Sequence, residues 1–177
     1  YYIESSDGGK TWTNVAGEPL ELPLTDKKSP ALVRDYQAEG RLCYMKCLRY
    51  SEEGHPIILY LTSGGYESGP ANDPRTFTTA AWNGSEWEFR EAMHGDNNYD
   101  FASLDVHPNG DWLLLGDTEP GPQRYNTGGE VALWKSTDRG GHWQKIRQLT
   151  SNSKYNHYYP RKPLNAHPDF FALWADG

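Results

Sequence analysis

Two stretches of the sequence share the pattern S-x-D-x-G-x-x-W: Ser136-Thr137-Asp138-Arg139-Gly140-Gly141-His142-Trp143 and Ser5-Ser6-Asp7-Gly8-Gly9-Lys10-Thr11-Trp12. In each stretch the Asp carboxylate can accept backbone N–H groups inside a turn, the Gly permits a positive φ, and the Trp packs the hairpin against its neighbour. We therefore expect structural roles for both sets of residues: Ser5, Asp7, Gly9 and Trp12, and Ser136, Asp138, Gly140 and Trp143. A third turn, Asn83-Gly84-Ser85-Glu86-Trp87, keeps the Trp but lacks the Ser and the Asp.

Short runs of β-forming residues lie between these turns and other clusters of Gly, Pro, Asn and Asp, and the sequence carries no helical stripe longer than two turns. The predicted strands are 41–50, 56–63, 76–82, 86–92, 101–107, 111–117, 130–136 and 142–149. They form two groups of four antiparallel strands, and each group has the size of one propeller blade. The sequence therefore predicts an all-β fold made of four-stranded antiparallel blades.

The blade pattern also predicts how the chain is divided. Residues 41–92 and 101–149 would each form one blade. Residues 1–16 would supply the end of a preceding blade, and residues 155–177 the start of the next one. A closed propeller needs at least about four blades, so we expect residues 1–177 to be part of a single β-propeller domain, a fragment of about three blades.

Charge and composition argue against several classes of function. Lys and Arg number 17 against 24 Asp and Glu, and the formal charge of −7 argues against a nucleic-acid partner. No apolar run approaches the roughly 18 residues of a membrane span. Neither octapeptide continues to the Glu that closes a calcium loop, and no paired zinc motif occurs, so we predict no metal and no cofactor.

The two cysteines, Cys43 and Cys47, lie four residues apart in one predicted strand. Their Cα atoms would be about 13 Å apart, beyond the reach of a disulfide. We expect free thiols that face the same side of the strand and pack in the core.

The octapeptide pattern resembles the Asp box, or BNR repeat, of sialidase-like β-propellers, in which the boxes lie on the outer rim. A narrower resemblance rests on six further motifs: Asp73-Pro74-Arg75, Asn98-Tyr99-Asp100, Thr118-Glu119-Pro120-Gly121-Pro122-Gln123, Gly128-Gly129-Glu130, Asn156-His157-Tyr158 and Asn165-Ala166-His167-Pro168-Asp169-Phe170. They look like signatures of a BNR-repeat subgroup similar to the seven-bladed lyases that act on ulvan and to enzymes that cleave rhamnose-glucuronic acid linkages. Members of that subgroup often carry His where this chain has Asn97.

The resemblance implies a seven-bladed ring and chemistry on a uronate. Elimination across a uronate needs a clamp on the carboxylate, a base for the C5 proton and an acid for the leaving oxygen, and Tyr, His and Arg can supply all three. Two clusters offer these residues: Asn98-Tyr99-Asp100 with Glu119 and Gln123-Arg124-Tyr125, and Tyr155-Asn156-His157-Tyr158-Tyr159-Pro160-Arg161-Lys162. We predict Tyr99 and His157 as catalytic residues, and as substrate-binding residues Asn98, Arg124, Tyr158 and Arg161.

A structural alternative stays open for these clusters. Tyr and Asn could form hydrogen bonds between blades, Arg161 could meet a neighbouring carboxylate, and Glu130 could satisfy backbone N–H groups.

The predicted function is a secreted or periplasmic carbohydrate-active propeller whose partner is an acidic, uronate-containing polysaccharide, cleaved by β-elimination. One alternative is a propeller that binds glycans without cleaving them. Another is a glycoside hydrolase of the sialidase or rhamnosidase type. The sequence has neither a Gly-x-Ser-x-Gly motif nor a phosphate-binding loop, so serine hydrolysis and nucleotide chemistry lack support.

Overall fold

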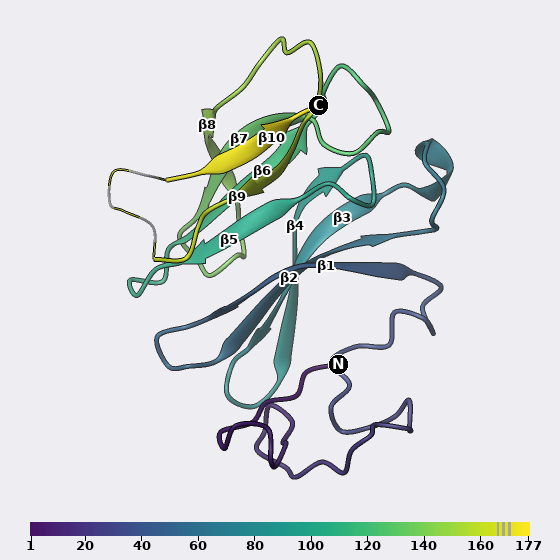
Figure 1. Cartoon of the computed structure of the whole chain (residues 1–177), viewed down its shortest axis with the longest axis vertical. Coiled ribbons are helices and arrows are strands. Elements are labelled where there is room, and N and C mark those ends of the chain that lie inside the picture. The colour runs from purple at the N-terminus through teal and green to yellow at the C-terminus, as the bar shows by residue number, and fades with distance from the viewer. Residues whose placement is uncertain (166, 168, 170) are drawn as a thin grey trace.

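The computed structural model describes residues 1–165, 167, 169 and 171–177. Ala166, Pro168 and Phe170, from the last of the quoted motifs, lie outside the described residues. The described part is built from strands, with a single short 3₁₀ helix, η1 (Pro70–Asn72) (Figure 1). The strands are β1 (Leu42–Tyr50), β2 (Pro56–Ser63), β3 (Arg75–Trp82), β4 (Trp87–Gly95), β5 (Ala102–Val106), β6 (Trp112–Glu119), β7 (Glu130–Ser136), β8 (Gln144–Gln148), β9 (His157–Arg161) and β10 (Leu173–Asp176).

The strands form two four-stranded antiparallel sheets in simple up-and-down order, β1-β2-β3-β4 and β5-β6-β7-β8, and a two-stranded sheet of β9 and β10 (Figure 1). This confirms the predicted all-β class and its four-stranded antiparallel sheets. All eight strands predicted between residues 41 and 149 form, with ends that differ by a few residues. The largest difference is at β4, which continues to Gly95 instead of ending at residue 92.

Strand β2 is buried along its whole length because both faces of the first sheet are covered. One face packs against the second sheet in a core made of Ile57, Leu59, Leu61, Phe77, Met93, Ala102, Leu104, Trp112 and Leu114. The other face, with Ile58 and Tyr60, packs against the N-terminal segment through Tyr2. Burial on both faces explains why β2 reads as a nearly continuous apolar run instead of an alternating one.

The N-terminal 40 residues form no strand, which is less regular than the hairpin expected in residues 1–16. Pairing there is limited to isolated bridges, Glu4 with Thr13 and Thr13 with Pro19. The segment is held instead by its packing, for example by the edge-on contact of Tyr2 with Trp87, whose ring centroids are 5.9 Å apart. The packing of Tyr2 therefore holds the segment on the first sheet where strand pairing is limited to these bridges.

The two octapeptides fold into turns with the same hydrogen bonds. In each turn the Asp Oδ1 accepts the N–H of the residue four positions later, and the Ser Oγ accepts the N–H of the Gly four positions later; the donors are Thr11 and Gly9 at 3.0 and 2.9 Å, and His142 and Gly140 at 2.8 and 2.8 Å. In the third turn Asn83 Oδ1 takes over the role of the Asp and accepts the N–H groups of Ser85 and Glu86, both at 2.9 Å. The hydrogen bonds expected of Asp7 and Asp138 and the positive φ expected of Gly9 and Gly140 are confirmed.

The cysteines are free thiols, as predicted, but they do not face the same side. A β-bulge between Met45 and Cys47 shifts the register of β1 on β2, so Cys43 pairs with Thr62 whereas Cys47 pairs with Leu59. Residues opposite Thr62 and Leu59 lie on opposite faces of the sheet because side chains alternate along a strand. The prediction of a shared face was wrong because strict alternation was assumed across the bulge.

The structure has no helix, in its described residues, that is long and apolar enough to cross a membrane.

Candidate functional site

The longer connections gather at one end of the two sheets, which we call the loop end (Figure 1). They are the β2–β3 loop (64–74), the β4–β5 loop (96–101) and the β6–β7 loop (120–129). The short turns 51–55, 83–86, 107–111 and 137–143 lie at the opposite end, the turn end. The first sequence cluster predicted to carry chemistry lies at the loop end, and the second begins there and continues along β9.

Asp100 organises the β4–β5 loop. Its carboxylate is buried and accepts the backbone N–H groups of Asp96, Asn97 and Gly128, each at 2.8 Å. The first two bonds close the turn that carries Asn98 and Tyr99, and the third fixes the β6–β7 loop beside it. The Asn-Tyr-Asp motif therefore works as a unit in which the Asp holds the position of the Tyr.

A second buried carboxylate and a half-buried lysine lie behind this loop. Asp117 Oδ1 accepts the N–H of Phe101 at 2.6 Å, while its Oδ2 is buried without a hydrogen-bond partner among the described residues. Lys46 Nζ donates to the carbonyl of Asn98 at 2.9 Å. Attraction to Asp100 and Asp117 favours the charged ammonium, but burial dominates and lowers the pKa of Lys46 to about 8.

The carboxyl groups of Asp96, Asp100 and Asp117 line a cavity of about 210 Å³, which His94, Glu119 and Arg124 also border. Burial raises the pKa of Asp100 to about 7. Burial also raises the pKa of Asp117, and the charge of Asp100 raises it further. The pair of Asp100 and Asp117 therefore retains a proton near neutral pH. No group of three His, Cys, Asp or Glu side chains in the described residues is arranged to hold a metal ion.

The side chain of Asn98 links three segments at the loop end by hydrogen bonds. Its side chain is 3% exposed, its Nδ2 donates to Tyr44 Oη at 3.0 Å and to the Gly65 carbonyl at 2.9 Å, and its Oδ1 accepts from Arg75 Nε at 3.2 Å. These bonds join β1, the β2–β3 loop and β3. In this arrangement Asn98 builds the site, and direct contact with a substrate stays a prediction.

Tyr99 projects from the loop into solvent. The residue is 58% exposed, and its ring packs edge-on against Tyr44 with 5.7 Å between centroids. Its backbone N–H donates to Asn97 Oδ1 at 2.9 Å. Tyr99 therefore presents a phenol from a backbone that is fixed on both sides, by Asn97 and by Asp100.

The β6–β7 loop joins the two sequence clusters. The buried Asn156 accepts the Gln123 N–H at 3.0 Å through its Oδ1, and its Nδ2 donates to the carbonyls of Gln123 and Gly128, both at 3.0 Å. On the other side of the loop, Arg124 Nε lies 3.1 Å from Asp96. The guanidinium of Arg124 remains half exposed beside the acidic cavity.

His157 is held by partners at both ring nitrogens. Nδ1 lies 2.5 Å from Asp176 Oδ1, and Nε2 lies 2.8 Å from Ser153 Oγ. The side chain is only 12% exposed. A role as base for a substrate would require one of these contacts to be released.

Glu130 accepts the N–H of Ser153 at 2.8 Å, which confirms the interpretation that its carboxylate satisfies backbone groups.

Arg161 lies next to the first cluster. Its guanidinium stands over the ring of Phe101, 4.2 Å from the centroid, and the residue is exposed. Tyr159 packs edge-on against the same ring at 6.1 Å, and Tyr158 packs edge-on against Tyr159 at 5.5 Å. These contacts place Arg161 and Tyr159 of the second cluster against Phe101, next to the loop that carries Tyr99.

The prediction from sequence missed Lys46 and Asp117. Both stand as lone charges at apolar strands, in Tyr-Met-Lys-Cys-Leu and in Leu-Leu-Leu-Gly-Asp. A charge in such a run is costly unless it is paired, and that cost was the available signal.

No model of a protein family matches the chain. No curated protein matches it either. Among solved structures, the chain is similar to an ulvan lyase of polysaccharide lyase family 25, with a TM-score of 0.64, 20% sequence identity and 94% of the chain covered. A second structure of the lyase, bound to -[GlcA(1-4)Rha3S]-, matches equally well. The chain spans 37% of the length of that lyase. The likeness shows a shared fold of the kind found in a polysaccharide lyase.

Proposed function

We propose that the chain is part of a polysaccharide lyase that cleaves an acidic, uronate-containing polysaccharide by β-elimination. The observation that supports it most is that Tyr99, Arg124 and Arg161 each keep an exposed functional group while neighbouring residues anchor them, on a fold like that of an ulvan lyase. A phenol and two guanidinium groups are the residue types that this chemistry needs. As part of this proposal, the chain belongs to a secreted or periplasmic Asp-box propeller. Residues 41–92 and 101–149 are two of its blades, flanked by the end of one blade (1–16) and the start of another (155–177).

In the proposed reaction, Arg161 and Arg124 bind the uronate carboxylate and stabilise the negative charge that develops on it as the C5 proton leaves. The C5–H electron pair forms the C4=C5 double bond, the C4–O4 bond breaks, and the leaving oxygen takes a proton. Tyr99 gives its phenolic proton to the leaving O4. The C5 proton goes to a second group, for which His157 is the candidate on the condition that Ser153 or Asp176 releases its ring.

The test is to incubate the protein that contains this chain with uronate-containing polysaccharides, ulvan among them. The ultraviolet absorbance of the unsaturated uronate product then measures the rate of elimination. Tyr99→Phe should lower the rate at least about 100-fold, the usual size of a lost proton-transfer group. Tyr50→Phe is the matched control, since Tyr50 is similarly exposed at 51% but ends β1 at the turn end. New reducing ends without that absorbance would indicate a hydrolase and refute the elimination.

A glycan-binding protein without catalysis is the second candidate. One observation favours it: Asn97 is buried and donates to the Tyr125 carbonyl at 2.7 Å, so the position next to Asn98 offers no imidazole. Binding of acidic oligosaccharides with no turnover, equally strong in the Tyr99→Phe variant, would support this candidate.

A further inference from the structure

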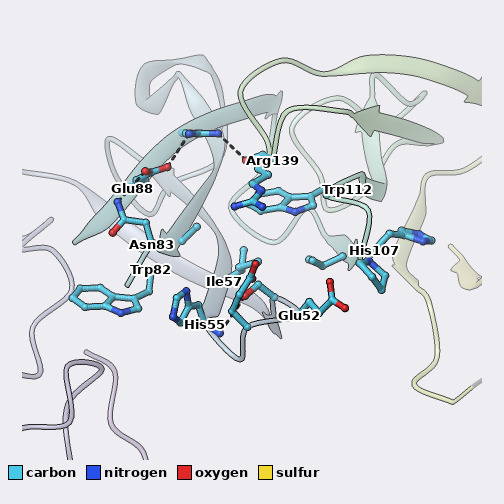
Figure 2. A pocket seen from close by; sticks show the side chains of 16 residues that line it. Glu52, His55, Ile57, Trp82, Asn83, Glu88, His107, Trp112 and Arg139 are labelled. Carbon is cyan, nitrogen blue, oxygen red and sulfur yellow. Dashed lines mark hydrogen bonds and ion pairs between the residues drawn. The ribbon is translucent and has the colours of Figure 1, made fainter. Parts of the chain in front are cut away.

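A cavity of about 330 Å³ lies between the two four-stranded sheets at the turn end, away from the surface that carries Tyr99 and Arg161. Its walls come from the β1–β2, β3–β4, β5–β6 and β7–β8 turns and the strands beside them (Figure 2). The volume falls at the lower end of the range of small-molecule sites. No residue that lines it belongs to the loop end.

The floor of this cavity is apolar, with one polar atom. Ile57, Ala81 and Val106 line it together with Trp112. Trp112 is 4% exposed, and its indole N–H makes no hydrogen bond with the part of the chain that the structure describes. Figure 2 shows the indole facing the cavity above Ile57 and Glu52. A buried indole N–H usually has a partner, so this one is a donor available to a ligand.

The rim carries groups of both charges. Glu52 and Glu53 bring exposed carboxylates, and the guanidinium of Arg139 has no ion pair or hydrogen bond to the described residues. His55 adds a ring at the edge of the cavity, where it packs against Gly84. The groups that can meet a ligand are therefore donors from Trp112 and Arg139 and acceptors from Glu52 and Glu53, although Ser51 also contacts Glu53.

The cavity is preformed because its roof is tied down. Arg90 donates to the carbonyls of Asp138 and Arg139, each at 3.0 Å, and its other Nη lies 2.7 Å from Glu88. Gly140 packs so closely on Trp112 that a Cβ there would lie 2.7 Å from the ring. The second octapeptide turn is thus fixed on the first sheet, and ligand binding needs no ordering of the walls.

The mixture of charges selects the class of ligand. An anion would meet the carboxylates of Glu52, Glu53 and Glu88, and a cation would meet the guanidinium groups of Arg90 and Arg139. A neutral group with several hydroxyls can donate to the carboxylates and accept from Trp112 and Arg139, while its C–H face covers the apolar floor. We propose that this cavity binds one neutral pyranose unit of a polysaccharide, a second carbohydrate site separate from the loop end.

The test uses the ¹⁵N-labelled 177-residue chain and follows the Trp112 indole N–H signal by NMR. Methyl glycosides of rhamnose and xylose are the neutral probes, and glucuronate and glucosamine are their charged counterparts. We expect the neutral probes to shift the Trp112 signal with millimolar dissociation constants, and the charged ones to bind at least about fivefold more weakly.

Variants locate the site. Arg139→Ala and Glu52→Gln should each weaken binding of the neutral probe at least threefold, whereas Arg147→Ala, which removes an exposed Arg from β8, should leave it unchanged. An unmoved Trp112 signal, equal shifts with charged sugars, or equal losses in Arg139→Ala and Arg147→Ala would overturn the proposal. The readout is independent of catalysis, so a chain without lyase activity would still give a clear answer.

Discussion

Replacing Asp117 by Asn should make the protein more stable at pH 8. The Asn keeps the Oδ1 that accepts the Phe101 N–H, and it puts an amide where Oδ2 is now buried without a partner among the described residues. It also removes the ionisable group that faces Asp100. Because the pKa of Asp117 is raised, folding at pH 8 must either protonate this carboxyl or bury its charge, and the variant avoids both costs.

The magnitude follows from Asp100. Its pKa rises from 3.8 to about 7, and at about 1.4 kcal/mol for each pKa unit the folded protein prefers the protonated form by roughly 4 kcal/mol. Between about pH 4 and pH 7 the folded state holds more protons than the unfolded state, so the free energy of unfolding falls as pH rises and levels off above pH 7. The contribution is fully present only below the unfolded pKa. Asp117, whose pKa is also raised, adds to this slope. In Asp117→Asn its share is lost, so the slope should be shallower, and at pH 8 the variant should gain about 1–3 kcal/mol.

The assay is urea unfolding followed by tryptophan fluorescence at several values between pH 4.5 and pH 8. Glu21→Gln is the control, since it removes the same charge from an exposed position. A variant less stable than the original at pH 8 would refute the reasoning. So would an unfolding free energy of the original chain that does not change between pH 4.5 and pH 8.

Three further outcomes test other parts of the structure. Arg161→Ala should weaken binding of an acidic oligosaccharide about tenfold and reduce the salt dependence of that binding, measured by calorimetry at two ionic strengths. Asn156→Ala should lower the free energy of unfolding by about 3 kcal/mol, because buried carbonyl and N–H groups of the β6–β7 loop lose their partner; a loss below 1 kcal/mol would contradict this. Gly140→Ala should be clearly more destabilising than Gly17→Ala in thermal unfolding, since both have φ above 80° but only the first would press a Cβ on Trp112.

The all-β class and the positions of the strands followed from local chemistry. Gly, Pro, Asn and Asp mark the turns, and the Asp and Ser of each octapeptide bond to N–H groups within four residues, so nothing distant is needed to form these turns. The apolar run of β2 likewise indicated a strand before its two covering layers were known. The residue types of the loop end were also visible in the sequence, because Tyr99 and Arg161 lie in recognisable motifs.

Only the tertiary structure decided which of those side chains are free to contact a substrate. Asn98 bonds to Tyr44, 54 positions away, and His157 to Asp176, 19 positions away, and no sequence pattern gives such pairings. The bulge in β1 moved Cys43 and Cys47 to opposite faces, because register depends on the partner strand as well as on the strand itself. The group of Lys46, Asp100 and Asp117 arises in the same way: the middle of β1, the β4–β5 loop and β6 meet in space, and burial there shifts the pKa values of all three side chains.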